Sequence, residues 1–182
     1  MQKCDLLIKG ADVLINSGEL RDNVDIVIAD GRILAVDADL AKQYEADETI
    51  DGRYKLFMPG LVDSHMHTGQ QLLKGLVLDA KPIIWTRVML PFESTLTPGK
   101  MRLSAQAAAL EMIKSGTTGF IDAGSYYMED AARVYAESGL RGALSYSTMD
   151  EEGLPQSIAM DAQEAVRRTD SLYDGFHGNG EP

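Results

Sequence analysis

The feature that most constrains the fold of this chain is a junction that occurs twice. Ser115-Gly116 directly precedes the strand-like segment TTGFID, and Ser138-Gly139 directly precedes LRGALS. Glycine ends helices readily because it accepts a left-handed backbone conformation, so each junction is typical of a helix that feeds straight into a strand. Helices and strands that alternate in this way predict βα units with a parallel sheet.

The helix before the first junction is predicted from its caps and its periodicity. Thr97 is a good N-cap and Pro98 fits the first helical position, so the helix should begin there and end at Gly116. The residues that recur at helical spacing, and that are therefore expected to face the core, are Leu103, Ala107, Leu110 and Ile113. Methionines at such spacing usually fill the core, which we expect of Met101, Met112 and Met128.

Two more helices and one irregular stretch are predicted in this half of the chain. A second helix is expected near residues 128–138, and a third from Pro155 to the HGNG segment at 177–180. GNG at 178–180 resembles the two helix–strand junctions described above. Between Thr68 and Leu96 the sequence predicts an irregular segment.

Residues 1–58 have the pattern of a small β layer. Short β-favouring runs alternate there with turn residues, and Asp30-Gly31 and Asp51-Gly52 are predicted to form tight hairpin turns. The run LFMPGLVDSH is nearly continuous and apolar, which is typical of a strand buried on both faces of a parallel sheet. We therefore predict one domain over 1–58 and another over 59–182. A βα barrel needs eight units and about 250 residues, so the three units here predict the first part of a larger protein.

His65 and His67 follow this apolar run, separated by one residue. Residues i and i+2 of a strand share one face, so the two imidazoles should project together from the carboxyl end of the strand. Neutral imidazole is a good ligand for zinc or ferrous iron, and Asp63, two residues earlier on the same face, is expected to orient a histidine. The alternative is that both are polar residues at an exposed strand end.

Composition excludes several classes of function. The formal net charge of −11 argues against binding to a phosphate backbone, and no apolar run approaches the length of a membrane span. Cys4 is the single cysteine, which excludes an internal disulfide, and the N-terminus lacks the pattern of a secretory signal. We therefore expect a cytoplasmic protein that binds neither nucleic acid nor membrane.

The segment FMPGLVDSHMHTGQQLLKG resembles the first barrel strand of the amidohydrolase superfamily, whose members carry PG-h-h-D/N-x-H-x-H there. DGRI, LTPGKMRLSAQAAALEMIKSGTTGFID and ESGLRGALSYSTMD resemble its aminohydrolase and chlorohydrolase subgroup, which includes S-adenosylhomocysteine/methylthioadenosine deaminases and triazine hydrolases. The resemblance covers essentially the whole chain. It implies an α/β fold in which 59–182 supply the first three βα units of a metal-dependent (β/α)8 TIM barrel. Residues 1–58 would be the N-terminal portion of a composite β-sandwich, completed by strands from the far C-terminus.

The resemblance also implies roles for particular residues. His65 and His67 match the first two ligands of one divalent metal, with zinc expected first and iron or manganese as alternatives. The family's further ligands and its proton-shuttling glutamate belong to later strands, so no catalytic acid or base is expected within this sequence. Glu93 matches the glutamate that binds the ribose hydroxyls of the substrate, and Trp85 lies in the loop that helps close the pocket. The alternatives are that Glu93 is an exposed loop carboxylate and that Trp85 is an aromatic that packs in the core or in a loop.

Two other positions bear on the resemblance. Tyr146 stands at the place of an arginine in the deaminases that act on methylthioadenosine, which weakens the case for that substrate. His177 is the third histidine of the chain. Its place at the predicted end of a helix favours a capping or surface role over metal ligation.

The function implied is that of a metal-dependent aminohydrolase, which deaminates an amino-substituted nitrogen heterocycle such as a purine, pterin or triazine by means of metal-bound hydroxide. Three alternatives remain open: a chlorohydrolase, a cyclic-amide hydrolase, and a non-catalytic fragment. The expected partners are the small-molecule substrate and the remainder of the barrel, supplied as a second chain or a swapped copy, and we expect a homo-oligomer. Residues 1–182 alone should retain metal weakly and show no turnover.

Overall fold

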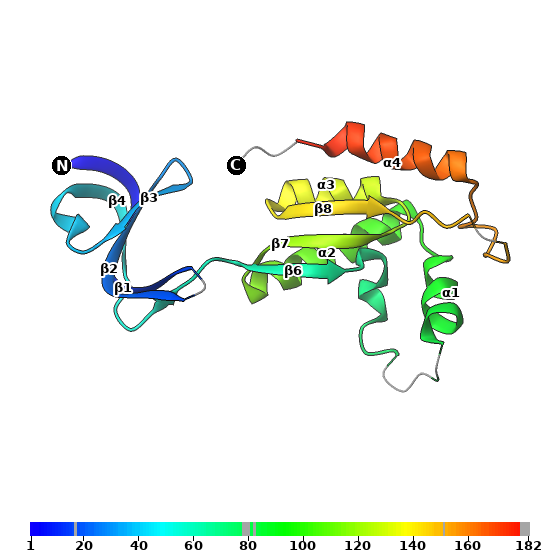
Figure 1. Ribbon diagram of the computed structural model, residues 1–182, viewed down its shortest axis with the longest axis horizontal. Helices are drawn as coiled ribbons and strands as arrows, with labels where there is room; N and C mark the ends of the chain where they lie inside the picture. The colour runs from blue at the N-terminus through cyan, green and yellow to red at the C-terminus, as the bar shows by residue number, and fades with distance from the viewer. Residues whose placement is uncertain (17, 78–80, 82, 151, 179–182) are drawn as a thin grey trace. The chain divides into compact units, whose positions relative to one another are not determined.

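The computed structural model of the protein describes residues 1–16, 18–77, 81, 83–150 and 152–178. The chain divides into two compact units, Met1–Pro59 and Gly60–Pro182, shown in Figure 1. Among the described residues, no helix has both the length and the apolar character needed to cross a bilayer.

The first unit is a five-stranded sheet built around one long central strand. Strand β1 (Gln2–Asn16) pairs antiparallel with β2 (Glu19–Ala29), and β2 pairs antiparallel with β3 (Arg32–Asp37). On its other side β1 pairs in parallel with β4 (Tyr44–Asp51) and β5 (Leu56–Phe57), and the short helix η1 (Leu40–Lys42) precedes β4. Both faces of the sheet bury apolar side chains: Leu7 and Ile8, which are neighbours in β1, belong to two different clusters.

One of the two predicted hairpin turns is confirmed and the other is wrong. Asp30 and Gly31 join β2 to β3 with φ of 51° and 69°, as the tight turn requires. Asp51-Gly52 forms no hairpin, because β4 and β5 both run parallel to β1. Gly52 instead packs so tightly on the central strand that a Cβ there would lie 2.8 Å from the Cβ of Ala11.

The strand predicted over LFMPGLVDSH is broken at its proline. Leu56 and Phe57 form β5 in the first unit, whereas β6 (Leu61–Met66) belongs to the second. The prediction of burial on both faces was also wrong, since Leu61 is 50% exposed and Val62 is 69% exposed. Within the described residues β6 pairs with one strand only, so it lies at the edge of its sheet.

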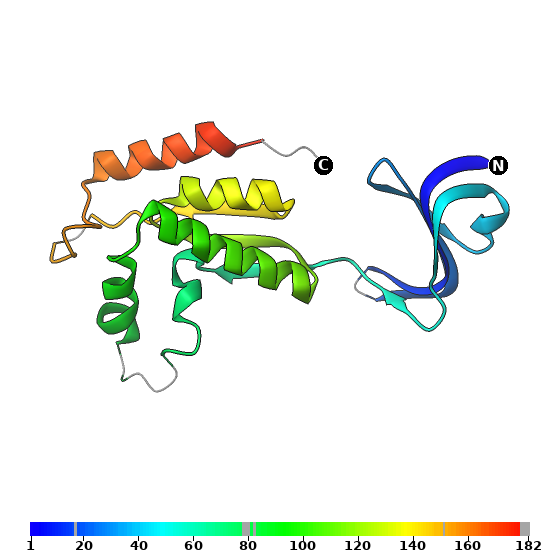
Figure 2. The same cartoon turned by 180° about the vertical axis from the view of Figure 1, so that it is seen from behind.

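The second unit contains a parallel three-stranded sheet in the order β6, β7 (Thr117–Ser125), β8 (Arg141–Tyr146). Helix α2 (Pro98–Ser115) connects β6 to β7, and α3 (Met128–Ser138) connects β7 to β8. Figure 2 shows α2 and α3 side by side over one face of this sheet. The α/β alternation predicted from the two glycine junctions is therefore present.

The N-cap of α2 and the glycines that end α2 and α3 are as predicted. Thr97 Oγ1 accepts a hydrogen bond from the amide of Lys100 at 3.3 Å. Gly116 and Gly139 end α2 and α3 with φ of 79° and 76°. These ends were readable because each depends on residues a few positions apart in the sequence.

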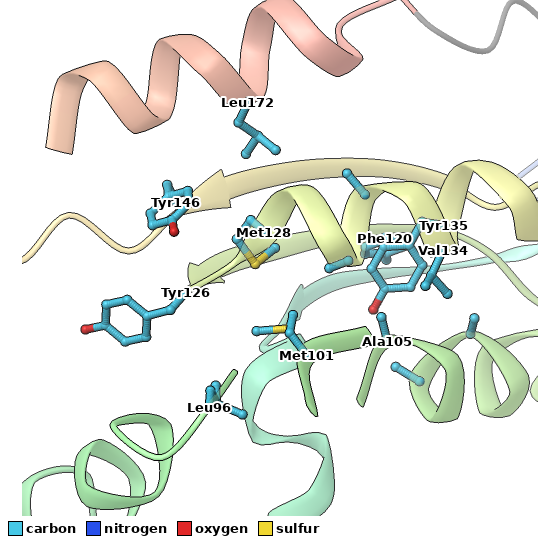
Figure 3. Packing of buried hydrophobic residues seen from close by; sticks show 14 of the residues in the cluster. Leu96, Met101, Ala105, Phe120, Tyr126, Met128, Val134, Tyr135, Tyr146 and Leu172 are labelled. Atoms are coloured by element: carbon cyan, nitrogen blue, oxygen red, sulfur yellow. The ribbon is translucent and has the colours of Figure 1, made fainter. Parts of the chain in front are cut away.

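The core of the second unit lies between the sheet and the helices, as Figure 3 shows. The predicted inward face of α2 was wrong: Leu103, Leu110 and Ile113 are more than half exposed. Small side chains form the buried face and allow close approach to α3, with methionines between them; this face consists of Met101, Ser104, Ala105, Ala108, Ala109 and Met112. The expectation that Met101, Met112 and Met128 fill the core is confirmed.

The remaining predictions for this unit needed correction. The segment predicted as irregular contains η2 (Thr68–Leu73), the π-helical η3 (Trp85–Met89) and α1 (Leu90–Glu93). The third long helix, α4 (Ala162–Phe176), begins seven residues later than predicted, because Asp161 rather than Pro155 caps it: Asp161 Oδ1 accepts from the amide of Glu164 at 2.7 Å. Residues 179 and 180 of the predicted third junction lie outside the described residues.

Candidate functional site

The candidate site lies at the carboxyl ends of β6 and β7. Because the strands are parallel, the residues that follow each strand meet at the same edge of the sheet. His65 and His67 come from the end of β6, and Asp122, Gly124 and Ser125 from the end of β7.

The two imidazoles lie next to each other. Their ring centroids are 5.0 Å apart and their planes are inclined by 78°. His65 is within β6, and His67 continues its extended backbone with φ −132° and ψ 102°, so the alternation of side chains carries both rings to one side. The predicted shared orientation of the two histidines is confirmed.

One hydrogen bond fixes which ring nitrogen of His67 is free. Nδ1 of His67 lies 3.2 Å from the carbonyl oxygen of Gly124. A carbonyl can only accept, so Nδ1 is the donor, and in the neutral ring Nε2 then keeps its lone pair. Gly124 has φ +104°, and a Cβ there would lie 3.0 Å from the carbonyl carbon of Tyr146, so this position requires glycine.

Asp63 does not orient an imidazole as predicted. Its Oδ1 accepts a hydrogen bond from the backbone amide of His65 at 3.1 Å. The carboxylate therefore acts on the backbone of the strand end, and the ring of His65 stays exposed to solvent.

The histidines open onto a pocket of about 320 Å³. Its walls come from the end of β6, from η2 and from the helical segment η3; the lining residues are His65, Met66, His67, Gln70, Gln71, Leu73, Lys74, Val77 and Met89. Part of the wall is apolar and part carries amide and charged groups, a mixture that suits a small polar heterocycle.

Glu93 is buried beside this pocket, which removes the exposed-carboxylate alternative. It is 5% exposed, and its Oε1 accepts from Ser125 Oγ at 3.2 Å and from Gln70 Nε2 at 3.4 Å. Burial raises the pKa of this carboxyl, while the hydrogen bonds from Gln70 and Ser125 and the charge of His67 lower it in part.

Trp85 and Tyr146 lie in different surroundings. Trp85 begins η3 and is 46% exposed, so it does not pack in the core. Tyr146 is buried at the end of β8, and its hydroxyl accepts hydrogen bonds from Arg168 Nη1 at 3.1 Å and from the amide of Tyr127 at 3.0 Å. Arg168 of α4 therefore contacts Tyr146, the residue expected from the sequence to replace an arginine.

His177 is not part of the histidine pair. It ends α4 on the surface, and its ring stacks on Tyr173 with centroids 4.3 Å apart. The expected capping or surface role agrees with this position.

Sequence reasoning missed Asp122. Its carboxylate is 1% exposed and accepts hydrogen bonds from Thr68 and Gly124, the residues next to His67 and opposite its ring. The available signal was an acidic residue at the end of the otherwise apolar strand segment TTGFID. Only pairing with β6 brings it to the histidines.

The donor set fits a divalent metal in part. Two adjacent imidazoles, which bind zinc in their neutral form, are suited to a metal site. Among the described residues there is no group of three or more histidine, cysteine, aspartate or glutamate side chains arranged to hold a metal ion. These residues therefore offer two candidate ligands rather than a complete site.

Comparison with known proteins agrees with this arrangement. The sequence model of the amidohydrolase family matches residues 56–177. The chain is 34% identical over 176 residues to the 5-methylthioadenosine/S-adenosylhomocysteine deaminase of Acetivibrio thermocellus, a match that covers 94% of this chain and 41% of that protein. The chain thus spans about two fifths of the length of this relative.

Two solved structures have the same fold. An adenosine deaminase from Xanthomonas campestris with bound zinc superposes with a TM-score of 0.84 at 24% identity, over 97% of this chain and 41% of that one. A triazine hydrolase from Arthobacter aurescens superposes with a TM-score of 0.82 at 23% identity, over 97% and 44%.

Proposed function

This chain belongs to the amidohydrolase family, and from that premise we propose that it forms the metal-binding edge of an enzyme that hydrolytically deaminates an amino-substituted nitrogen heterocycle. The observation that supports the proposal best is the histidine pair, in which the ring of His67 is held through Nδ1 with Nε2 free. The relatives compared above include deaminases of adenosine-type compounds.

The proposed architecture is a larger barrel to which the strands and helices of the second unit belong. We propose that β6, β7 and β8 with their helices are the first βα units of a (β/α)8 barrel, and that the sheet of residues 1–58 is part of a β-sandwich. The exposed apolar side chains of the edge strand β6, Leu61 and Val62, suit a strand that is covered in the complete protein. We keep the cytoplasm as the proposed location.

The proposed ligands are His65 and His67. A divalent metal, zinc in the first instance, would supply the Lewis acidity that activates water for hydrolysis. Catalytic zinc sites usually have three protein ligands, so further ligands must join this pair. Within this chain, the Gly124 carbonyl accepts the proton of His67 Nδ1 and so holds the ring in place.

Glu93 is proposed to bind the substrate. Burial raises the pKa of this carboxyl, and its oxygens can accept hydrogen bonds from the hydroxyl groups of a substrate. Ser125 and Gln70 hold one of its oxygens in place. Trp85, half exposed on η3, is proposed to close over the bound heterocycle.

The test measures ammonia released by the natural protein, meaning the whole polypeptide that its gene encodes. The substrates are a panel of amino-substituted purines, pterins and triazines, with zinc, iron or manganese supplied. His65→Ala and His67→Ala should each abolish turnover, whereas the matched control His177→Ala should retain it, because His177 is exposed at the end of α4. Turnover that survives loss of both pocket histidines would contradict the proposal. Release of chloride without ammonia would favour a chlorohydrolase, and ring opening a cyclic-amide hydrolase.

A further inference from the structure

We propose that Asp122 is a positioning residue for His67. Its carboxylate holds both the segment that directly follows this histidine and the residue whose carbonyl accepts the ring proton. The inference deepens the proposed function, because it concerns the same metal-binding edge and rests on that assignment. The hydrogen bonds of the Asp122 carboxylate go to Thr68 and Gly124 and not to either imidazole.

The first arm of this arrangement runs through Gly124. Oδ1 of Asp122 accepts the amide of Gly124 at 2.8 Å, across the register irregularity between Asp122 and Ser125 near the end of β7. The carbonyl of Gly124 lies 3.2 Å from Nδ1 of His67. Gly124 has φ +104°, which residues other than glycine rarely adopt, and it packs closely on the end of β8. The carboxylate of Asp122 adds a direct hydrogen bond to its amide.

The second arm runs through Thr68. Oδ2 of Asp122 accepts the backbone amide of Thr68 at 3.1 Å and also accepts its hydroxyl. This amide belongs to the peptide bond that leaves His67, so the contact fixes the backbone from which the imidazole projects. The hydroxyl of Tyr135, 2.7 Å from Thr68 Oγ1, donates to it, because the threonine proton already points to Asp122.

The whole arrangement is buried and therefore rigid. Thr68 and Ser104 are fully buried, Asp122 is 1% exposed, and Ser104 Oγ donates to the carbonyl of Thr68 at 2.6 Å. Burying a carboxyl group is costly unless its oxygens are satisfied by hydrogen bonds. The donors to Asp122 are the amide and hydroxyl of Thr68, which follows His67, and the amide of Gly124, whose carbonyl faces the His67 ring.

This geometry matters for metal binding because a histidine binds a metal through one nitrogen only. The hydrogen bond on the other nitrogen sets the tautomer and the direction of the ring, and loss of such partners typically weakens metal binding about 10–100-fold. Asp122 acts one step further out, on the carbonyl that makes this bond and on the backbone of the histidine.

The experiment uses Asp122→Asn in the full natural protein. Asparagine keeps the volume but has one acceptor oxygen, so it cannot accept both the Thr68 and the Gly124 amides. We expect the dissociation constant for zinc, measured by competition with a chromophoric chelator, to rise by roughly 10-fold, the lower end of the range for direct partners of a ligand, because Asp122 acts one step further out. In the metal-free protein, the ¹⁵N shifts of the His67 ring should change from the Nδ1–H tautomer to a mixture of tautomers.

The matched control is Asp130→Asn on α3. Asp130 is 13% exposed and pairs with Arg102 and Arg133, outside the site, so its replacement should leave zinc affinity and the His67 tautomer unchanged. A second variant, Thr68→Val, removes the hydroxyl at nearly constant volume and should weaken zinc binding less than Asp122→Asn. It decides the matter if Asp122→Asn does not fold.

Wild-type zinc affinity together with a wild-type tautomer, in folded Asp122→Asn or in Thr68→Val, overturns the proposal. Failure of the wild-type protein to bind zinc would count against the proposed function instead. The tautomer of His67 in the metal-free protein would still decide the role of Asp122 in that case.

Discussion

Glu93 is held by a serine that can approach only because residue 69 has no side chain. A Cβ on Gly69 would lie 2.0 Å from Ser125 Oγ, the atom that donates to the Glu93 carboxylate. Gly69 and Ser125 are both buried, so neither can move into solvent to relieve the contact. The buried carboxylate beside the pocket therefore depends on a glycine that sequence reasoning gave no role.

Gly69→Ala should destabilise the protein by about 1–3 kcal/mol, as overpacking of a filled core does, and should displace Ser125 from Glu93. Gly99→Ala is the control. Gly99 is exposed in α2 with nothing within 4 Å of its added Cβ, so alanine there should stabilise by about 0.5–1 kcal/mol. Urea unfolding of both variants measures the difference. Equal stability of the two would show that the site accommodates the methyl group.

At the scale of elements, acidic side chains at the start of α4 cap the helix and pair with arginines one turn later. Asp161 caps the helix through the amide of Glu164, and the side chain of Glu164 pairs with Arg167 and Arg168. Hydrogen bonds from these two arginines lower the pKa of Glu164 to about 2, from a model-compound value of 4.5. Arg168 in turn reaches the hydroxyl of Tyr146 at the end of β8, so this pairing connects the helix to the sheet.

This lowered pKa predicts a pH dependence with a definite sign. A carboxylate whose pKa is depressed in the folded state stabilises it above the unfolded pKa, and that stabilisation is lost as pH falls from about 4.5 toward about 2. Glu164→Gln should therefore be less stable than wild type at neutral pH, and the difference should vanish across this window. The pair is exposed to solvent, so the effect should be small and should shrink in high salt.

The measurement is thermal unfolding followed by circular dichroism between pH 2 and 7. Glu137→Gln, which removes an exposed glutamate from α3, is the control and should not show the same convergence with wild type. A stability difference for Glu164→Gln that stays constant down to pH 2 would contradict the assignment.

At the scale of the whole molecule, a metal at the pocket edge would act on stability as well as on chemistry. The two histidines belong to β6 and to the start of η2, and their positions depend on contacts with β7. A ligand that binds the folded state and not the unfolded chain stabilises the folded state in proportion to the logarithm of its free concentration. Metal binding should therefore be visible in unfolding curves without any assay of turnover.

Zinc should raise the thermal midpoint of the natural protein, and a chelator should reverse the rise. At a free zinc concentration 100 times the dissociation constant, the gain is about 2.7 kcal/mol. His65→Ala and His67→Ala should each lose most of the gain, whereas His177→Ala, whose ring stacks on Tyr173, should keep it. The same gain in His67→Ala would place the metal elsewhere. Differential scanning calorimetry with and without chelator measures all four proteins.

Whether a feature of the fold could be predicted depended on how far apart in the sequence the residues that determine it lie. Helix caps and the ends of α2 and α3 were predictable, because each involves residues within a turn of one another. The buried face of α2 was not, since both Leu103 and Ala105 fit a helical period and only packing against α3 selects the small residues. The break at Pro59 was missed for a similar reason: β5 and β6 pair with strands of different units.

Three properties were predictable from the sequence: the alternation of helix and strand, the resemblance to the amidohydrolase superfamily, and the paired projection of His65 and His67. All of these are local patterns. The folded structure is needed to show that His67 Nδ1 faces a carbonyl, that Glu93 is buried, and that the Asp122 carboxylate accepts the amide of Thr68. Asp122 lies 54 residues from Thr68, its hydrogen-bond partner. The physical reason is that such contacts exist only once parallel pairing has brought the ends of β6 and β7 together.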